Sequence, residues 1–172
     1  MTVRHTSRTI DAHSAKRKTR GGEARMAKAY SVGPIQRHQV DRAFRLMEVV
    51  GYELDLTKWR EFCAAAFARQ PISPYAQEIV TVENARGYIA GLGIAHVAHD
   101  PLYGRLLDVP VFLVISAGDT PGVSDALLEY LMAAARNRRC SLMRIAATEP
   151  DSWPERPGRP QRPDRGTFIP VQ

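Results

Sequence analysis

The sequence predicts an α+β fold, and the order of its periodic segments is the main reason. Apolar runs of strand length alternate with amphipathic runs of helical length in the order β-α-α-β-β-β-α-β, with a short strand expected at the end. Three consecutive strands in the middle are typical of antiparallel pairing, whereas a helix joining the last two long strands makes that pair parallel. We therefore expect a mixed, mostly antiparallel sheet with one parallel β-α-β crossover and helices on both faces.

The first part of the chain is expected to supply one strand and two helices. The strand covers 29–35 and ends at a Gly-Pro pair. Both helices are amphipathic; Gly51 ends the first and Pro71 ends the second. The residues expected to point inward are Val40, Phe44, Leu46, Met47 and Val50 in the first helix and Trp59, Phe62, Cys63, Ala66 and Phe67 in the second.

The rest of the chain is expected to complete the sheet. Strands at 77–84 and 87–97 flank a glycine-containing turn and form a hairpin. After a loop, an apolar strand at 106–115 is followed by the strongest helical pattern, Ser124 to Arg136, and then by a strand at 140–146. The helix residues expected to be buried are Leu127, Leu128, Leu131 and Ala135.

Composition divides the chain into four regions. Residues 1–28 form a basic tail that is expected to be disordered, and 29–148 form the domain. Residues 149–166 are too rich in proline for regular structure, and 167–172 are a candidate last strand. Met26 stands just before the first strand, so the residues ahead of it are either an upstream extension or an arm that binds nucleic acid.

The excess positive charge of the chain lies in the tail. The sequence has 24 basic and 18 acidic residues and a pI of about 9.7. Residues 1–28 hold eight of the basic and two of the acidic residues, which leaves sixteen of each in the rest of the chain. The domain is therefore neutral overall, and a nucleic-acid-binding face on it is not indicated.

Membrane and disulfide chemistry are not indicated either. The longest apolar run, Val109 to Ile115, is too short to span a bilayer, and the basic N-terminus has no apolar segment behind it. Cys63 and Cys140 lack the CxxC spacing of metal or redox sites and are expected to be unpaired core residues. These features favour a cytoplasmic protein.

The stretch from Val114 to Ser124 is the main candidate for a functional site. An apolar strand ends there, and a turn of small residues leads into a helix, an arrangement whose backbone N–H groups bind phosphate in many proteins. The turn nevertheless contains Asp119 and no Lys or Arg. It either binds an anionic cofactor or is a tight turn in which Asp119 or Thr120 caps the helix.

The order of elements and this turn together resemble the GCN5-related N-acetyltransferase (GNAT) superfamily over about residues 29–146. In that family the fourth strand runs into the motif [Q/R]-x-x-G-x-[G/A], which a helix follows. Asp119 to Ser124 match the motif in length, with Gly122 on the required glycine and Ser124 on the second small position. Asp119 stands where Gln or Arg is usual. The resemblance implies transfer of an acetyl group from acetyl-CoA to an amine.

The resemblance also implies which residues bind acetyl-CoA. Phe112 would supply a backbone N–H to the acetyl carbonyl, and Pro110 fits a bulge that the family carries in this strand. Two departures weaken the phosphate site, since Pro121 has no N–H and Asp125 adds a second negative charge. The implied cofactor-binding residues are Phe112 and Val114 on the strand and Asp119, Thr120, Gly122, Val123 and Ser124 in the turn.

Asp108 is the implied general base, at the position where histone-acetylating members carry a glutamate. It lies in an apolar strand, a setting that can raise the pKa of a carboxyl group toward a useful value. The alternative is that Asp108 is only the polar residue at which a buried strand begins. Many members use a tyrosine on a later helix as general acid, but the proline-rich segment takes the place of that helix here. No residue is therefore assigned to this role.

Three other patterns are weaker. Gly91 and Gly93 fit a glycine-bearing strand better than a dinucleotide-binding loop, because no helix follows them. His96 and His99 lack the carboxylate or cysteine pattern of a metal site, so no metal is expected. Tyr52 lies between the first two helices, where it either packs them together or lines the acceptor pocket of the family.

We therefore expect an acyl-CoA-dependent N-acyltransferase that acts on the amine of a small molecule or peptide, with acetyl-CoA as co-substrate. The alternative is a non-catalytic protein of the same fold that binds a partner. No membrane partner is expected, and nucleic acid only through the tail. The sheet edge left by the missing helix favours a homodimer.

Overall fold

In the computed structural model, the described residues are 30–69, 76–146 and 166–172. The basic tail and the proline-rich segment up to residue 165 lie outside them. The described residues form one six-stranded sheet whose strands follow the chain order, β1 to β6. The strands are β1 (Tyr30–Pro34), β2 (Glu78–Asn84), β3 (Ile89–Asp100), β4 (Gly104–Val114), β5 (Leu142–Ala146) and β6 (Gly166–Pro170).

The sheet is mixed, as predicted. Only β4 and β5 are parallel, with Leu106–Val109 paired to Leu142–Ile145, and every other neighbouring pair is antiparallel. The expected loop at 99–105 is mostly strand, because β3 and β4 form one long hairpin. The Asp100 carboxylate closes its turn by accepting the N–H groups of Leu102 and Tyr103 at 2.8 and 3.1 Å.

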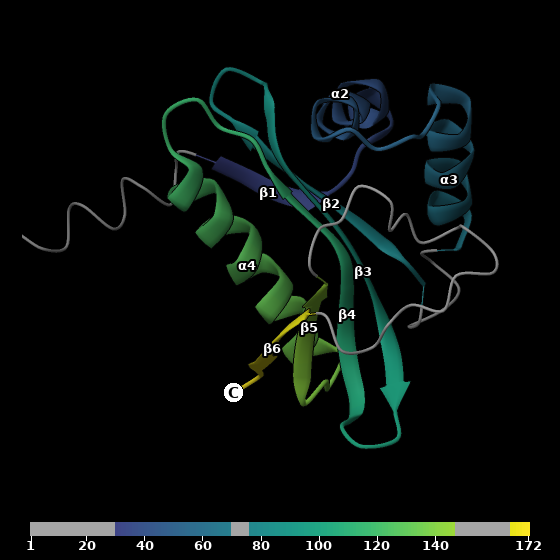
Figure 1. Ribbon diagram of the computed structural model, residues 1–172, viewed down its shortest axis with the longest axis vertical. Coiled ribbons are helices and arrows are strands. Elements are labelled where there is room, and N and C mark those ends of the chain that lie inside the picture. The colour runs from purple at the N-terminus through teal and green to yellow at the C-terminus, as the bar shows by residue number, and fades with distance from the viewer. Residues whose placement is uncertain (1–29, 70–75, 147–165) are drawn as a thin grey trace, which may run out of the picture.

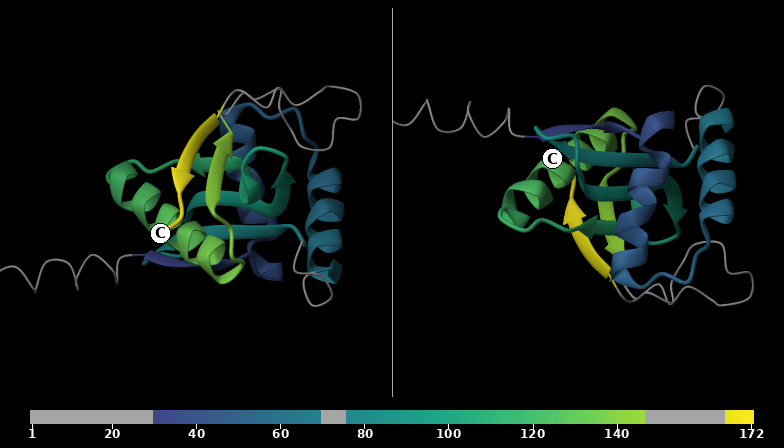
Figure 2. Two further views of the ribbon diagram at one scale, coloured as in Figure 1. Left: turned by 90° about the horizontal axis from the view of Figure 1, so that it is seen from below. Right: turned by 90° about the horizontal axis from the view of Figure 1, so that it is seen from above.

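Helices cover both faces of the sheet, as predicted (Figures 1 and 2). A short 3-10 turn, η1 (Arg37–Gln39), leads into α2 (Val40–Val50), and α3 (Leu56–Arg69) follows. Both lie on one face, whereas α4 (Thr120–Asn137) lies on the other. Gly51 ends α2 with a φ of 83°, a left-handed conformation that glycine adopts without strain.

The core beneath α2 and α3 is centred on Trp59. Its side chain is fully buried, and its indole N–H donates to the carbonyl of Val40 at 2.7 Å, which ties α3 to the start of α2. Tyr52 is also buried in this core, where burial raises the pKa of its hydroxyl. Of the ten residues expected to point inward, only Val50 and Phe67 are partly exposed.

The core beneath α4 depends on close packing against β3. A Cβ atom on Gly91 would lie 2.9 Å from Val82 and 3.1 Å from Val123, and one on Gly93 would lie 3.2 Å from Leu127. The two glycines thus let the first turns of α4 approach the sheet. Leu127, Leu131 and Ala135 are buried as expected, but Leu128 is only partly buried.

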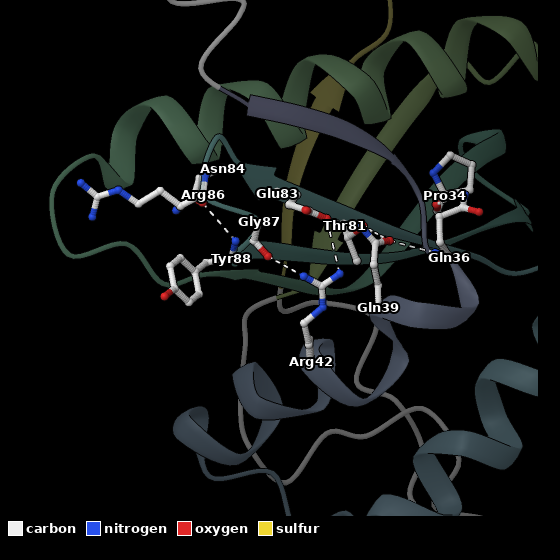
Figure 3. A network of polar contacts seen from close by, with 10 residues as sticks. All are labelled: Pro34, Gln36, Gln39, Arg42, Thr81, Glu83, Asn84, Arg86, Gly87 and Tyr88. Atoms are coloured by element: carbon white, nitrogen blue, oxygen red, sulfur yellow. Dashed lines mark hydrogen bonds and ion pairs between the residues drawn. The ribbon is translucent and has the colours of Figure 1, made fainter.

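A polar network fixes α2 to the turn between β2 and β3 (Figure 3). The buried Gln39 side chain donates to Glu83 at 2.6 Å and accepts the hydroxyl of Thr81 at 3.1 Å. Arg42 donates to the carbonyl of Gly87 at 2.6 Å and lies 3.9 Å from Glu83. These contacts hold η1 and the start of α2 against β2 and the turn that follows it.

A β-bulge interrupts β4 at Val109 and Pro110. Ile94 pairs with Val111 and His96 pairs with Asp108, so two residues of β4 lie opposite Ala95 alone. Proline is tolerated at this position because a bulged residue does not need to donate to the ladder. The side-chain alternation reverses there, since Leu107 and Val109 pack under α4 whereas Val111 and Leu113 pack under α2 and α3.

Two further expectations concern the cysteines and the membrane. Cys63 and Cys140 are unpaired and buried, as predicted, and burial raises the pKa of the Cys63 thiol to about 12. Within the described ranges, no helix combines the length and apolar character needed to cross a bilayer.

Candidate functional site

Strand β4 connects the two parts of the predicted site. Asp108 lies just before the bulge, and the loop after Val114 leads into the N-terminus of α4. Six residues of extended chain separate Asp108 from Val114, which corresponds to about 20 Å. In the described residues, the ladder between β4 and β5 ends at Val109 and Ile145, whereas β4 continues to Val114 along β3.

Asp108 is buried and ion-paired. Its side chain is 5% exposed, and Oδ1 accepts a hydrogen bond of 2.8 Å from Nε of Arg144, its neighbour on β5. That bond raises the pKa of the Arg144 guanidinium above its ordinary value. The Arg144 guanidinium therefore supplies the opposite charge that a buried carboxylate needs.

His96 forms the other side of this cluster. Its Nε2 atom lies 3.7 Å from Oδ2 of Asp108, and its side chain is 34% exposed. Nδ1 of the same ring is buried and has no hydrogen-bond partner. Asp108 lies on the α2–α3 face of the sheet, because its neighbours Leu107 and Val109 pack on the α4 face. His96, Asp108 and Arg144 therefore form one row across β3, β4 and β5.

Phe112 and Val114 lie beyond the bulge and are partly buried on the α4 face. They pair across the ladder with Gly93 and Gly91, respectively. Their position places them between the Asp108 row and the N-terminus of α4, as the resemblance implies.

At the N-terminus of α4, the cap residue is Asp119 rather than Thr120. Oδ1 of Asp119 accepts the backbone N–H of Gly122 at 2.9 Å, and Oδ2 accepts the hydroxyl of Tyr30 at 2.8 Å. The pKa of Asp119 lies below its ordinary value, mainly because the Tyr30 hydroxyl donates to the carboxylate and secondly because the Gly122 N–H does. The carboxylate is thus ionised and held by donors from two elements.

This cap uses the same donors that a bound phosphate would need. The N–H of Gly122 is bonded to the Asp119 side chain, and that of Val123 donates to the Asp119 carbonyl at 3.2 Å. Pro121 has no N–H. Thr120 donates its hydroxyl to the carbonyl of Ser116 at 3.2 Å, and Ser124 lies in the second turn of α4. At the turn predicted to bind the pyrophosphate, the Asp119 carboxylate therefore already accepts the N–H of Gly122.

The structure brings together residues that sequence analysis did not assign. Tyr30, at the start of β1, reaches Asp119, and Arg144 reaches Asp108. A signal for the second pair was present, since Arg144 is the one charged residue in a short apolar strand that must pair with the Asp108 strand. No comparable signal identified Tyr30. His99 is not part of the Asp108 row, and the described residues contain no group of three or more His, Cys, Asp or Glu that could hold a metal.

Several solved structures have a similar fold. The Brucella melitensis ribosomal-protein-alanine N-acetyltransferase is 17% identical, with a TM-score of 0.55 over 70% of this chain and 82% of that one. The Arabidopsis thaliana glucosamine-6-phosphate N-acetyltransferase is 16% identical, with a TM-score of 0.52 over 69% and 82%. Aminoglycoside N-acetyltransferase AAC(6')-Iy, solved with CoA, is 13% identical, with a TM-score of 0.57 over 70% and 78%.

The mixed sheet, its single parallel crossover and the bulged β4 place the protein in the α+β class. More particularly, it has the fold of the GNAT superfamily, as the resemblance predicted. No family model and no curated protein matches the sequence. At these identities the similarity shows the fold.

Proposed function

We propose that this protein is an acyl-CoA-dependent N-acyltransferase that transfers an acetyl group to the amine of a small molecule or peptide. The observation that carries the proposal is the form of β4. The strand bulges at Val109–Pro110, continues past the end of its ladder with β5, and leads directly into the N-terminus of α4. CoA has a thiol and a diphosphate at the two ends of its pantetheine arm. The part of β4 beyond the bulge likewise runs from beside the Asp108 row to the loop that leads into α4.

The proposed roles follow from position along this strand. Phe112 and Val114 would contact the pantetheine arm, and the turn from Asp119 to Ser124 would face the diphosphate. The thioester would lie near the bulge, beside Asp108. Asp108 is too buried to meet a bulky acceptor directly, so the half-exposed His96 is the group through which a proton from the amine would reach it.

Isothermal titration with acetyl-CoA tests the proposal, with Gly122→Val as the disabling variant. A side chain at this position would enter the space directly above the first turn, since even a Cβ atom would lie 2.2 Å from Asp119. We expect wild-type protein to bind and Gly122→Val to lose binding. Gly118→Val is the matched control, because a Cβ atom on Gly118 would have no heavy atom within 4 Å. Release of free CoA in a screen of amines would then identify the acceptor.

A second candidate is a non-catalytic protein that retains this fold for binding a partner. Two contacts favour it: the Gly122 N–H is already bonded to Asp119, and Asp108 is neutralised by Arg144. Under this hypothesis wild-type protein does not bind acetyl-CoA at millimolar concentration. Asp119→Arg, which introduces a residue usual in the family motif, would then also fail to bind. Binding by either protein would contradict the second candidate.

A further inference from the structure

The carboxylate of Asp119 lies directly over the first turn of α4. Its two oxygens are each bonded to a separate donor, Oδ1 to the N–H of Gly122 at 2.9 Å and Oδ2 to the hydroxyl of Tyr30 at 2.8 Å. A Cβ atom added to Gly122 would lie between 2.2 and 2.8 Å from all three atoms of the carboxyl group. The space that Gly122 leaves open above the turn is thus filled by an anion that belongs to the chain.

A diphosphate at this turn would have to compete with that anion. To accept the N–H of Gly122, a phosphate oxygen must displace Oδ1, and Asp119 then remains within a few ångströms because it is the cap residue of the same helix. Like charges at such a separation repel, although water and salt reduce the effect near a surface. Among the described residues, the Tyr30 hydroxyl and the Gly122 N–H donate to the Asp119 carboxylate, and neither donor carries a positive charge.

The pantetheine end of an acyl-CoA would not compete with the Asp119 carboxylate. The pantetheine arm carries amides and a thioester but no charge, and the part of β4 assigned to it, Phe112 to Val114, has apolar side chains. Affinity that depends on this arm is therefore unaffected by the charge of Asp119, whereas affinity that depends on the diphosphate is reduced by it.

We propose that Asp119, held in place by Tyr30, determines acyl-donor specificity by cancelling the affinity that the diphosphate of CoA would add. The inference rests on the proposed acyltransferase function and names its donor class more closely. The recognised group is the pantetheine thioester, so acyl-pantetheine and acyl-phosphopantetheine serve as donors as well as acyl-CoA does. The negative charge of Asp119 disfavours any donor that carries a diphosphate at this turn.

A series of donors that differ only in phosphate tests this inference. Acetyl-pantetheine, acetyl-4′-phosphopantetheine and acetyl-CoA are titrated into wild-type protein, Asp119→Ser and Tyr30→Phe. Binding is followed by calorimetry and by the backbone amide NMR signals of Val114 and Gly122, which report the two ends of the site without any reaction. Serine retains a neutral N-cap, so α4 keeps its first turn in the variant.

For wild-type protein we expect the three dissociation constants to agree within about threefold. Asp119→Ser should tighten acetyl-CoA binding by about tenfold or more, while acetyl-pantetheine binding stays unchanged. Tyr30→Phe should tighten acetyl-CoA binding by a smaller factor, because the carboxylate remains but loses one of its two bonds.

Two results would overturn the inference. The first leaves the proposed acyltransferase function intact, and the second contradicts it as well. In the first, wild-type protein binds acetyl-CoA a hundredfold more tightly than acetyl-pantetheine, and Asp119→Ser does not change the ratio. The protein then recognises the diphosphate of CoA, and the acyltransferase proposal stands without the inference about Asp119. If no thioester in the series binds the folded wild-type protein or Asp119→Ser, the acyltransferase proposal fails as well.

Discussion

Arg144 on β5 and Asp108 on β4 form a hydrogen-bonded ion pair of 2.8 Å between two neighbouring parallel strands. The pair is largely withdrawn from water, with side-chain exposures of 17% and 5%. It joins the two strands at the last pair but one of their common ladder, next to the bulge. The contact therefore links the stability of the sheet to the predicted catalytic position.

Replacing Arg144 by Met should destabilise the protein by about 2–3 kcal/mol, because the buried Asp108 carboxylate would lose its charge partner. Urea unfolding followed by circular dichroism measures the difference. Arg60→Met is the matched control, since Arg60 pairs with Asp41 at 2.6 Å but both side chains are more than half exposed. We expect almost no change for the control. Equal losses in the two variants would contradict a special role for the Arg144 pair.

Asp108→Asn tests the proposed proton transfer. The substitution keeps the shape of the side chain and removes its basicity. On an acceptor found in the amine screen, we expect turnover to fall by about 10²–10⁴-fold, with the KM for acetyl-CoA little changed. Near-normal turnover would show that Asp108 is not the base.

His96→Asn tests whether His96 acts together with Asp108, its neighbour in the row, in the proposed proton transfer. If the proton passes through the half-exposed imidazole, this variant should lose most of the turnover, as Asp108→Asn does. The two losses should not add in the double variant, because the residues would act as one unit. Additive losses would indicate that His96 contributes only to packing.

The fold could be predicted from the sequence because the signals for it are local. The helix containing Trp59 and the glycine-bearing strand β3 follow from periodicity within a dozen residues. The bulge at Pro110 was expected only from the family resemblance, with which a proline at this position is compatible. The boundaries were less accurate. The loop expected before β4 became part of a long hairpin, since backbone pairing between β3 and β4 extends past the last apolar residues.

The contacts of the candidate site could not be predicted in the same way. Asp108 and Arg144 are 36 residues apart, and Tyr30 and Asp119 are 89 residues apart. Each pair depends on strand register or on the position of a helix end relative to an edge strand, which short-range patterns do not determine. Sequence analysis therefore identified Asp108 and Asp119 as candidate site residues but did not identify Arg144 and Tyr30, which hydrogen-bond to them.

Trp59→Phe should cost about 2–3 kcal/mol of stability. The smaller ring leaves a void in a fully buried position, and the carbonyl of Val40 loses the indole N–H that now donates to it at 2.7 Å. Denaturant unfolding measures the loss. Tyr88→Phe is a suitable control because the Tyr88 side chain is largely exposed, and we expect it to change stability by less than about 0.5 kcal/mol. A similarly small change for Trp59→Phe would contradict its central place in the core.

Tyr30→Phe should change how stability depends on pH. The hydrogen bond lowers the pKa of Asp119 and raises that of Tyr30. Its stabilisation is therefore complete between the ordinary pKa values of the two groups, about 4 and about 10. It is lost as the pH falls through the lowered pKa of Asp119, or rises through the raised pKa of Tyr30.

Carboxyl ¹³C NMR titration of Asp119 checks this directly. In Tyr30→Phe the pKa of Asp119 should rise toward its ordinary value, and thermal unfolding of the two proteins should differ near pH 7 but converge in acid. An unchanged Asp119 pKa would mean that the hydroxyl does not hold the carboxylate in solution.

Removing residues 1–25 should leave the domain intact. The cut at Met26 falls four residues before Tyr30, so the pairing of Tyr30 with Asn84 and its bond to Asp119 are retained. Residues 1–25 contain few apolar side chains and most of the excess positive charge of the chain, so they can add little buried surface. We expect the melting temperature of the shortened protein to lie within about 2 °C of that of the full chain.

Retention on heparin, measured over a salt gradient, distinguishes the two interpretations of the tail. An arm that binds nucleic acid should give the full chain strong, salt-dependent retention that the shortened protein lacks, because the remaining domain is neutral overall. An upstream extension without that role should give little difference at physiological salt. A large drop in melting temperature on truncation would contradict the proposed boundary and would show that the first 25 residues pack against the domain.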